Sequence, residues 1–133
     1  MSDNFQDTYQ NLIQKLGGLI KAEADKEFPL QQSLRHKMPE EPAWLSAFVD
    51  VRWFADAEGF SGKLRIILPN EKLHGIYTSR DMKNLFREIW KVRKEDPTAC
   101  WYGLKVSVTY EGIVTTELNN DPNCIIDITF LQS

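Results

Sequence analysis

Few side chains in this sequence have the types and the spacing that catalysis requires. His36 is followed four residues later by Glu40, a spacing at which a helical carboxylate can orient an imidazole or share a metal ion with it. The segment has no second histidine at the spacing of the HExxH motif, so zinc-dependent hydrolysis is not predicted. The other histidine, His74, follows Leu73 in a short apolar stretch and is expected to be solvated or bonded to the backbone.

The candidates for nucleophilic, acid–base or phosphate chemistry are equally sparse. Ser61 lies in EGFSG, but a nucleophile elbow needs one residue between the serine and the second glycine, and Gly62 follows Ser61 directly. Adjacent carboxylates occur beside prolines at 40–41 and 95–96, in turn-like sequence where acids are normally solvated. No glycine pattern fits a phosphate-binding loop. We therefore predict a protein that is not an enzyme and needs no metal or cofactor; an acid–histidine enzyme is the weaker alternative.

A basic stripe is the strongest nucleic-acid signal in the chain. Its members recur at three- and four-residue spacing between residues 79 and 95, which places them along one face of a helix. They are Arg80, Lys83, Arg87, Lys91 and Lys94. Acidic residues share this segment, and a helix packed on a sheet presents a charged face to water in any case. We favour an ordinary solvated face and retain a nucleic-acid contact, as part of a regulatory or adaptor module, as the alternative.

The elements that must position these residues begin with an N-terminal helix. Apolar residues from Phe5 to Ile20 recur at helical spacing. Gly17 and Gly18 interrupt the pattern, and a glycine inside a helix costs about 1 kcal/mol relative to alanine. The pair therefore either ends the helix early or lets another backbone approach closely. Residues 22–43 are polar and contain three prolines, so we expect a connector with a short helix.

From residue 44 the apolar period changes to two, which indicates strands. Residues 44–55 and 63–69 alternate on either side of a turn-like segment and are expected to pair as an antiparallel hairpin. The short piece 73–77 is expected to add an edge strand. In the first strand one face is predicted to enter the core, and this face comprises Leu45, Ala47, Val49, Val51 and Trp53.

The second half of the chain predicts a helix followed by strands. The helix over 79–95 places Met82 and Phe86 on one apolar face. Beyond it, alternating segments separated by turns predict a three-stranded meander that ends with CIIDITFL. We therefore expect one α+β domain over residues 1–133, with an antiparallel, meander-like sheet of five to six strands. The N-terminal helix and the central helix are expected to pack on one face of that sheet.

The four tryptophans fall on two phases of the predicted pattern. Trp53 and Trp90 lie on apolar faces and are expected in the core. Trp44 and Trp101 fall on the opposite phase of their strands, where the second face of the sheet could be partly open. An exposed aromatic on a sheet face indicates a protein contact, and capping of the end of the sheet is the equal alternative.

Composition narrows the class of partner. The chain has 133 residues, 42% of them hydrophobic and 26% charged, which fits a single globular domain. We expect a cytoplasmic protein, because no apolar run could span a bilayer and MSDNFQDTYQ does not resemble a signal peptide. Cys100 and Cys124 are then expected to be buried free thiols. The net charge of −3 disfavours nucleic acid and favours a basic partner.

Residues 79–118 resemble a known family. The matching positions are Leu85, Phe86, Arg87 and Glu88 on the helix, Trp101 before the next strand, Leu104, Val106 and Val108 along that strand, and Gly112 in the following turn. This pattern is similar to the YezG-like antitoxins, which are immunity proteins of polymorphic toxin systems, including those of contact-dependent inhibition. The resemblance implies a cytoplasmic, non-catalytic protein that binds and neutralises a cognate toxin domain, often a nuclease.

Acidic residues near turns are the predicted contact residues of such an inhibitor. A toxic nuclease presents a cationic surface to hold phosphate, so an acidic inhibitor gains both steering and specificity by binding it. No membrane contact and no direct nucleic-acid contact are expected in this interpretation. The predicted partner-binding residues are Asp50 on the polar face of the first strand, Asp56 and Glu58 in the first hairpin turn, Glu117 and Asp121 near the last turn, and the aromatic residues Trp44 and Trp101.

Overall fold

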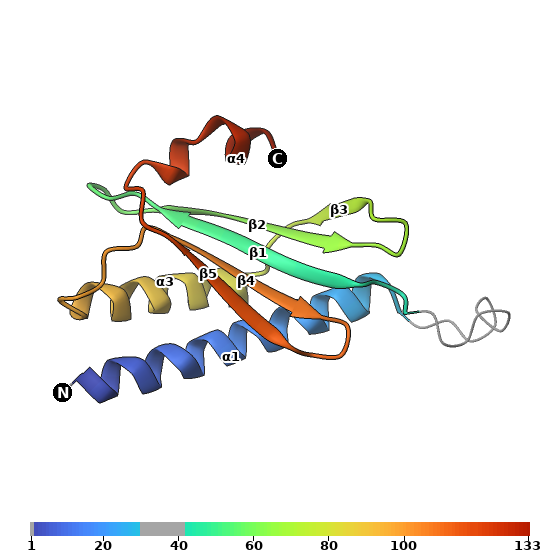
Figure 1. Ribbon diagram of the computed structural model, residues 1–133, viewed down its shortest axis with the longest axis horizontal. Coiled ribbons are helices and arrows are strands. Elements are labelled where there is room, and N and C mark those ends of the chain that lie inside the picture. The colour runs from blue at the N-terminus through green and yellow to red at the C-terminus, as the bar shows by residue number, and fades with distance from the viewer. Residues whose placement is uncertain (1, 30–41) are drawn as a thin grey trace, which may run out of the picture.

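The strands form one antiparallel sheet, shown in the computed structural model of the protein (Figure 1), which describes residues 2–29 and 42–133. Its order is β3-β2-β1-β4-β5. The strands are β1 (Ser46–Trp53), β2 (Phe60–Ile67), β3 (Leu73–Ile76), β4 (Gly103–Thr109) and β5 (Val114–Asn119). The predicted hairpin, edge strand and α+β class are thus confirmed. The candidate pair His36 and Glu40, and the short helix expected near them, lie outside the described residues.

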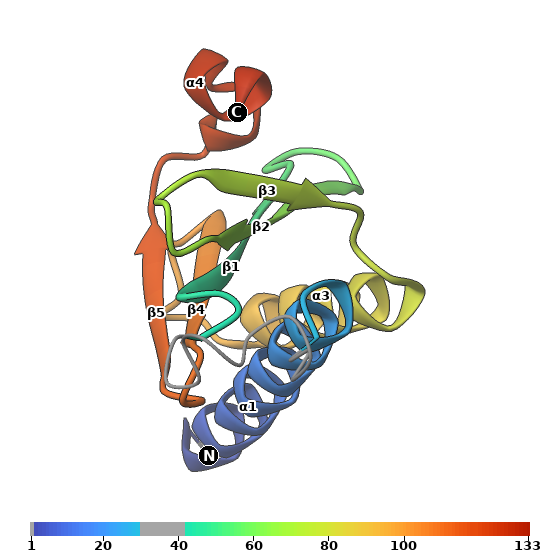
Figure 2. The same cartoon turned by 90° about the vertical axis from the view of Figure 1, so that its right-hand side faces the viewer.

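Two helices cover one face of the sheet and a shorter helical segment covers the other (Figures 1 and 2). The long helices α1 (Ser2–Glu27) and α3 (Arg80–Glu95) lie side by side beneath the sheet. The single-turn helix η1 (Cys124–Ile126) and α4 (Ile128–Gln132) lie above it. We call the face that carries η1 and α4 the second face. The two long helices pack on one face, as the sequence predicted.

The glycine pair does not end α1, which continues to Glu27. A Cβ atom added at Gly17 would lie 2.7 Å from Cγ2 of Val114 in β5, whereas one added at Gly18 would meet no atom within 4 Å. Of the two alternatives, close approach is therefore correct, although the approaching group is a side chain and not another backbone. Gly17 lets α1 pack tightly against β5.

The core lies between the sheet and the two long helices. Ala47, Val49, Val51 and Trp53 are buried, as the alternation of β1 predicted. The indole of Trp53 stacks on that of Trp90 with centroids 5.2 Å apart and ring planes 10° apart. Leu45 was expected on the same face but is 40% exposed. That expectation was wrong because β1 begins at Ser46, so the alternation of the strand does not extend to Leu45.

The start of α3 is fixed by a side-chain cap. The hydroxyl Oγ of Ser79 accepts a hydrogen bond from the backbone N–H of Met82 at 3.2 Å, which satisfies one of the free donors at the start of the helix. Met82, Leu85, Phe86 and Ile89 face the core and are buried, as the periodicity predicted. The helix crosses beneath the sheet and brings the chain from the edge strand β3 to β4, next to the central strand β1.

The expected final strand does not form. CIIDITFL folds instead into η1 and α4, and the two are separated by Asp127. The carboxylate of Asp127 accepts hydrogen bonds from the N–H groups of Thr129 and Phe130, which caps α4. The prediction of a strand was wrong because this local cap, and the burial of Phe130 one helical turn away, favour helix over alternation.

Candidate partner-binding surface

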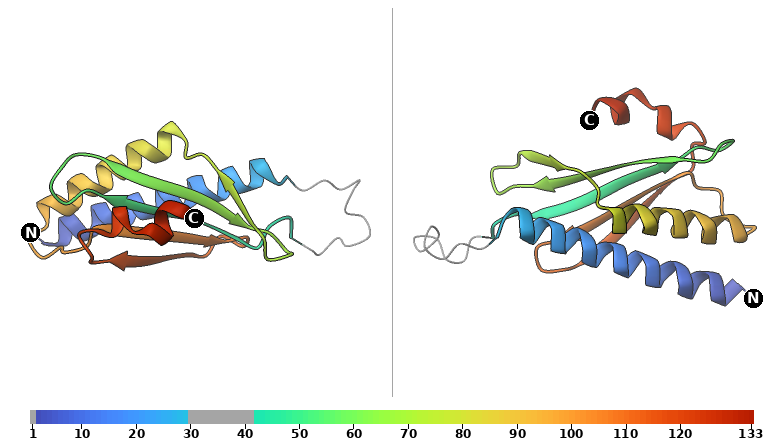
Figure 3. Two further views of the ribbon diagram at one scale, coloured as in Figure 1. Left: turned by 90° about the horizontal axis from the view of Figure 1, so that it is seen from above. Right: turned by 180° about the vertical axis from the view of Figure 1, so that it is seen from behind.

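Four of the predicted acidic residues lie at or near one end of the sheet. Arg52 pairs with Gly103 across β1 and β4, and Gly103 pairs with Asn119 across β4 and β5. The β1–β2 turn at 54–59 and the end of β5 therefore lie at the same end of the sheet (Figures 1 and 3). We call this region, which comprises Asp56, Glu58, Glu117 and Asp121, the acidic end.

The β1–β2 turn presents two carboxylates and an aromatic ring. Asp56 and Glu58 are exposed, and Phe54 is 41% exposed. The N–H of Phe54 donates to the carbonyl of Gly59 at 3.2 Å, which closes the turn. Gly59 has a φ of 128°, a conformation that favours glycine, and a Cβ there would lie 3.3 Å from the Phe54 ring.

A hollow of about 700 Å³ separates this turn from α3. Asp56 and Glu58 line it from the turn, and Arg87 and Lys94 line it from the helix. Aromatic side chains, including Trp90, complete the lining. The hollow can thus receive a polar group of either charge that is attached to an apolar stem.

Asp50 is held in an intramolecular ion pair on the second face. Its two carboxylate oxygens accept from Nε and Nη2 of Arg52 at 3.0 and 3.1 Å. Lys63 and Lys105 occupy the opposite positions on the two neighbouring strands. The Asp50 side chain is only 23% exposed. Its charge is therefore compensated within the chain by a direct ion pair.

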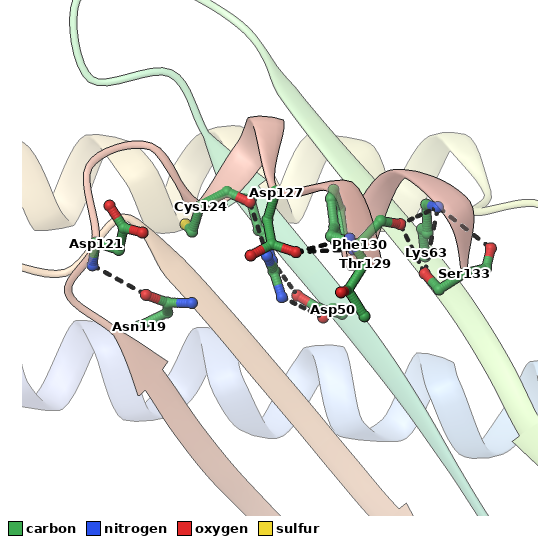
Figure 4. A network of polar contacts seen from close by, with 10 residues as sticks. Asp50, Lys63, Asn119, Asp121, Cys124, Asp127, Thr129, Phe130 and Ser133 are labelled. Carbon is green, nitrogen blue, oxygen red and sulfur yellow. Dashed lines mark hydrogen bonds and ion pairs between the residues drawn. The ribbon is translucent and has the colours of Figure 1, made fainter.

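Glu117 and Asp121 occupy different environments within the acidic end. Glu117 is exposed on β5, opposite Lys105 on β4. Asp121 accepts from the N–H of Asn123 at 2.9 Å, and its own N–H donates to the side chain of Asn119 at 2.9 Å (Figure 4). Asp121 is exposed, and it also shapes the turn that leads into η1.

Trp44 and Trp101 are both buried, so the expectation that they lie on a partly open face is wrong. Trp44 has no exposed surface, and its indole N–H donates to the Asp25 carboxylate at 3.0 Å. Trp101 is 8% exposed and packs edge-on against Trp53 and Trp90. Both precede their strands, so the alternation of the strand does not set their direction. Each covers an end of the core, which was the alternative interpretation.

The C-terminal segment, which comprises η1 and α4, is held on the second face by cationic side chains of the sheet (Figure 4). The ammonium of Lys63 donates to the carbonyl of Phe130, and Arg65 donates to the carbonyl of Ser133 at 2.9 Å. The Phe130 ring lies 4.1 Å from the guanidinium carbon of Arg52. Three aliphatic residues of this segment remain more than half exposed, namely Ile126, Ile128 and Leu131.

Sequence reasoning missed this apolar surface because it assigned the segment to a strand. The signal that identifies it is Asp127, which precedes Thr129 and Phe130 at the spacing of a helix cap. With that cap recognised, Phe130 is expected to face inward and Ile128 and Leu131 outward.

Among the residues that the structure describes, three ionisable groups have shifted pKa values. Burial raises the pKa of the Tyr9 hydroxyl and of the Cys124 thiol. Hydrogen bonds from the hydroxyl and the N–H of Thr98 lower the pKa of Asp96 at the end of α3. Cys124 is buried, as expected, whereas Cys100 is exposed, so the expectation that both thiols are buried was wrong for Cys100.

The remaining candidates from the sequence are His74 and the basic stripe. Nε2 of His74 lies 3.0 Å from the Glu27 carboxylate at the surface. The five residues of the basic stripe are all exposed along α3. Within residues 2–29 and 42–133, no group of three histidine, cysteine or acidic side chains is placed to hold a metal ion. In the same parts of the chain, no helix has the length and apolarity needed to cross a membrane.

Comparison of the chain with protein-family models finds no match. Comparison with curated proteins also finds no match.

Proposed function

We propose that this chain is an immunity protein that binds and neutralises a cognate toxin domain in the cytoplasm without catalysing a reaction. The resemblance of residues 79–118 to the YezG-like antitoxins motivates the proposal. In this proposal the partner is a basic nuclease, and binding blocks its active site or the approach of its substrate.

One observation carries the proposal: exposed carboxylates and exposed apolar side chains occur together at the acidic end. Asp56 and Glu58 flank the hollow beside α3, and Phe54 is exposed in the same turn. On β5, Glu117 is exposed on one face of the sheet and Leu118, which is 52% exposed, on the other. Apolar contacts supply affinity at a protein interface, and the carboxylates supply steering toward a cationic surface and exclude acidic partners.

Growth of cells that express the toxin domain encoded next to this chain tests the proposal. We expect the chain to restore growth and an unrelated immunity protein to fail. The double variant Asp56→Asn with Glu58→Gln is expected to weaken rescue. A control with the same change of charge, Glu71→Gln with Asp81→Asn, is expected to leave rescue intact, because Glu71 lies in the β2–β3 turn at the other end of the sheet and Asp81 lies in the first turn of α3. No rescue by the unmodified chain would refute the proposal.

The exposed basic stripe supports a second candidate, a regulatory or adaptor module that contacts nucleic acid through α3. Clustered cations along one helix face suit a phosphate backbone. Retention of the chain on RNA or DNA columns at low salt tests this candidate. Loss of retention when Lys91 and Lys94 are replaced by glutamine is expected if it holds, and absence of retention at low salt excludes it.

A further inference from the structure

Among residues 2–29 and 42–133, no strand pairs with the outer edge of β5. β5 pairs with β4 on one side and is the last strand of the sheet. The N–H of Thr109 donates to the carbonyl of Ile113 at 3.0 Å, and the register continues without interruption to Gly103 and Asn119. Because hydrogen-bonded pairs alternate along an antiparallel ladder, Thr115 and Glu117 direct their backbone groups to β4. The outward-facing residues are therefore Val114, Thr116 and Leu118.

The two edges of the sheet differ in protection. β3 is four residues long, and the ring of His74 within it packs edge-on against Phe28 at 4.9 Å and contacts Glu27. β5 is six residues long and has no proline and no bulge. In Figure 2 it borders the sheet on the side away from β3. Natural edge strands normally carry such protection against pairing, so an unprotected edge is a template for an added strand.

The charges around this edge indicate which kind of strand could pair with β5. Glu111 precedes β5, Glu117 lies within it and Asp121 follows it, and all three are exposed. A second copy of the chain pairing antiparallel about Thr116 would use all three outward-facing residues. That arrangement would bring Glu111, in the turn before β5, toward Asp121 of the second copy, in the turn after β5, and neighbouring like charges are unfavourable. A strand that carries lysine or arginine meets no such repulsion.

We propose that β5 accepts an extended basic strand of the toxin domain, which extends the sheet by one strand. This inference rests on the proposed function and adds the surface and the mode of binding. The backbone groups of Val114, Thr116 and Leu118 bond to the added strand, and a cationic side chain of that strand lies next to Glu117. Backbone bonds supply affinity in this mode, and side chains at alternate positions supply specificity.

A proline substitution in β5 tests pairing at this edge without removing the hydrogen bonds that hold β5 to β4. Thr116→Pro removes an outward N–H and leaves the bonds to β4 intact, whereas Thr116→Ala keeps that N–H. Proline is tolerated on the open side of an edge strand. By calorimetric titration with the toxin domain encoded next to the chain, we expect Thr116→Pro to weaken binding by about tenfold or more and Thr116→Ala to change it by less than about threefold. Equal binding by both variants would overturn the inference.

Amide hydrogen exchange on the unmodified chain gives a readout that does not depend on the folding of a variant. In the free chain, we expect the Thr116 and Leu118 amides to exchange quickly and those of Thr115 and Glu117 slowly. In the complex, the Thr116 and Leu118 amides should become protected. Exchange at the free rate in a complex that still forms would overturn the inference and leave the proposed function standing, whereas absence of any complex would refute the proposed function itself.

Sedimentation of the chain alone tests the second copy as the occupant. We expect a monomer whose mass is unchanged by Thr116→Pro. A dimer that this substitution dissociates would assign the edge to self-association and overturn the toxin-strand inference.

Discussion

At the scale of single residues, Trp44 shows how a polar contact fixes a large core side chain. Its ring has no exposed surface, meets Tyr110 edge-on at 5.2 Å, and directs its N–H to the Asp25 carboxylate at 3.0 Å. The ammonium of Lys21 lies 2.9 Å from the same carboxylate and 5.7 Å from the centroid of the indole. Trp44 therefore ties the end of α1 to the start of β1.

Replacing Trp44 with phenylalanine should destabilise the fold by about 2 to 4 kcal/mol, because it removes buried ring volume and a hydrogen bond to a charged group. Asp25→Asn keeps an acceptor for the indole and should cost about 1 kcal/mol or less. Urea denaturation of both variants measures the difference. Equal stability of Trp44→Phe and the unmodified chain would contradict the role assigned to Trp44.

The two thiols should differ sharply in reactivity. Cys100 is exposed, whereas Cys124 is 1% exposed and burial raises its pKa, so Cys124 holds less of the reactive thiolate at neutral pH. An aromatic disulfide reagent at pH 8 should therefore label one thiol quickly, and the second only after denaturation. Cys100→Ser should abolish the fast phase. A fast phase that survives this substitution would show that η1 opens readily from the sheet.

Asp96 gives a local dependence on pH. Hydrogen bonds from Thr98 hold its pKa below the ordinary value in the folded chain. A lowered folded pKa contributes stability that is present above the unfolded pKa and is lost as pH falls through the folded pKa. Thr98→Ala should raise the pKa of Asp96 toward its ordinary value, as followed by carbon NMR of its carboxyl group. An unchanged titration would show that the hydroxyl does not set the shift.

At the scale of elements, the contact between α1 and β5 depends on Gly17. Gly18→Ala should stabilise the fold by about 0.5 to 1 kcal/mol, since a Cβ there meets no neighbour and alanine favours helix. Gly17→Ala should destabilise it, because its Cβ would clash with Val114. Thermal denaturation distinguishes the two. Val114→Ala combined with Gly17→Ala should recover part of the loss, and no recovery would place the clash elsewhere.

Helices and strands whose apolar residues keep one spacing over several residues could be predicted from the sequence. Met82 to Ile89 and Ala47 to Trp53 follow one period over several residues, and each is buried as that period requires. Trp44 and Trp101 could not be placed, because they precede their strands and tertiary packing sets their direction. The contacts made by the candidate site residues could not be predicted from the sequence either. The order of residues does not show that both carboxylate oxygens of Asp50 accept from Arg52. It also does not show that Asp56 faces α3 across a hollow.

At the scale of the whole molecule, charge should govern the rate of association more than the lifetime of the complex. Exposed carboxylates at the acidic end act at a distance that salt shortens to about 10 Å at 0.1 M. On the proposed function, we expect the association rate with a basic toxin domain to fall as salt rises, while the dissociation rate changes little. Stopped-flow measurements at increasing salt test this. A rate independent of salt would show that apolar contacts alone guide the encounter.

The path of the chain beneath the sheet also has a consequence for how the molecule can be divided. Tyr77 is 99% exposed and lies between β3 and α3. Cleavage beside it separates β1, β2 and β3 from β4 and β5, and each piece then exposes an apolar strand that needs the other. Neither half can complete the sheet, yet the two supply each other's missing neighbour. The protein is therefore suited to fragment complementation, in which two separately made pieces reassemble through the pairing of β1 with β4.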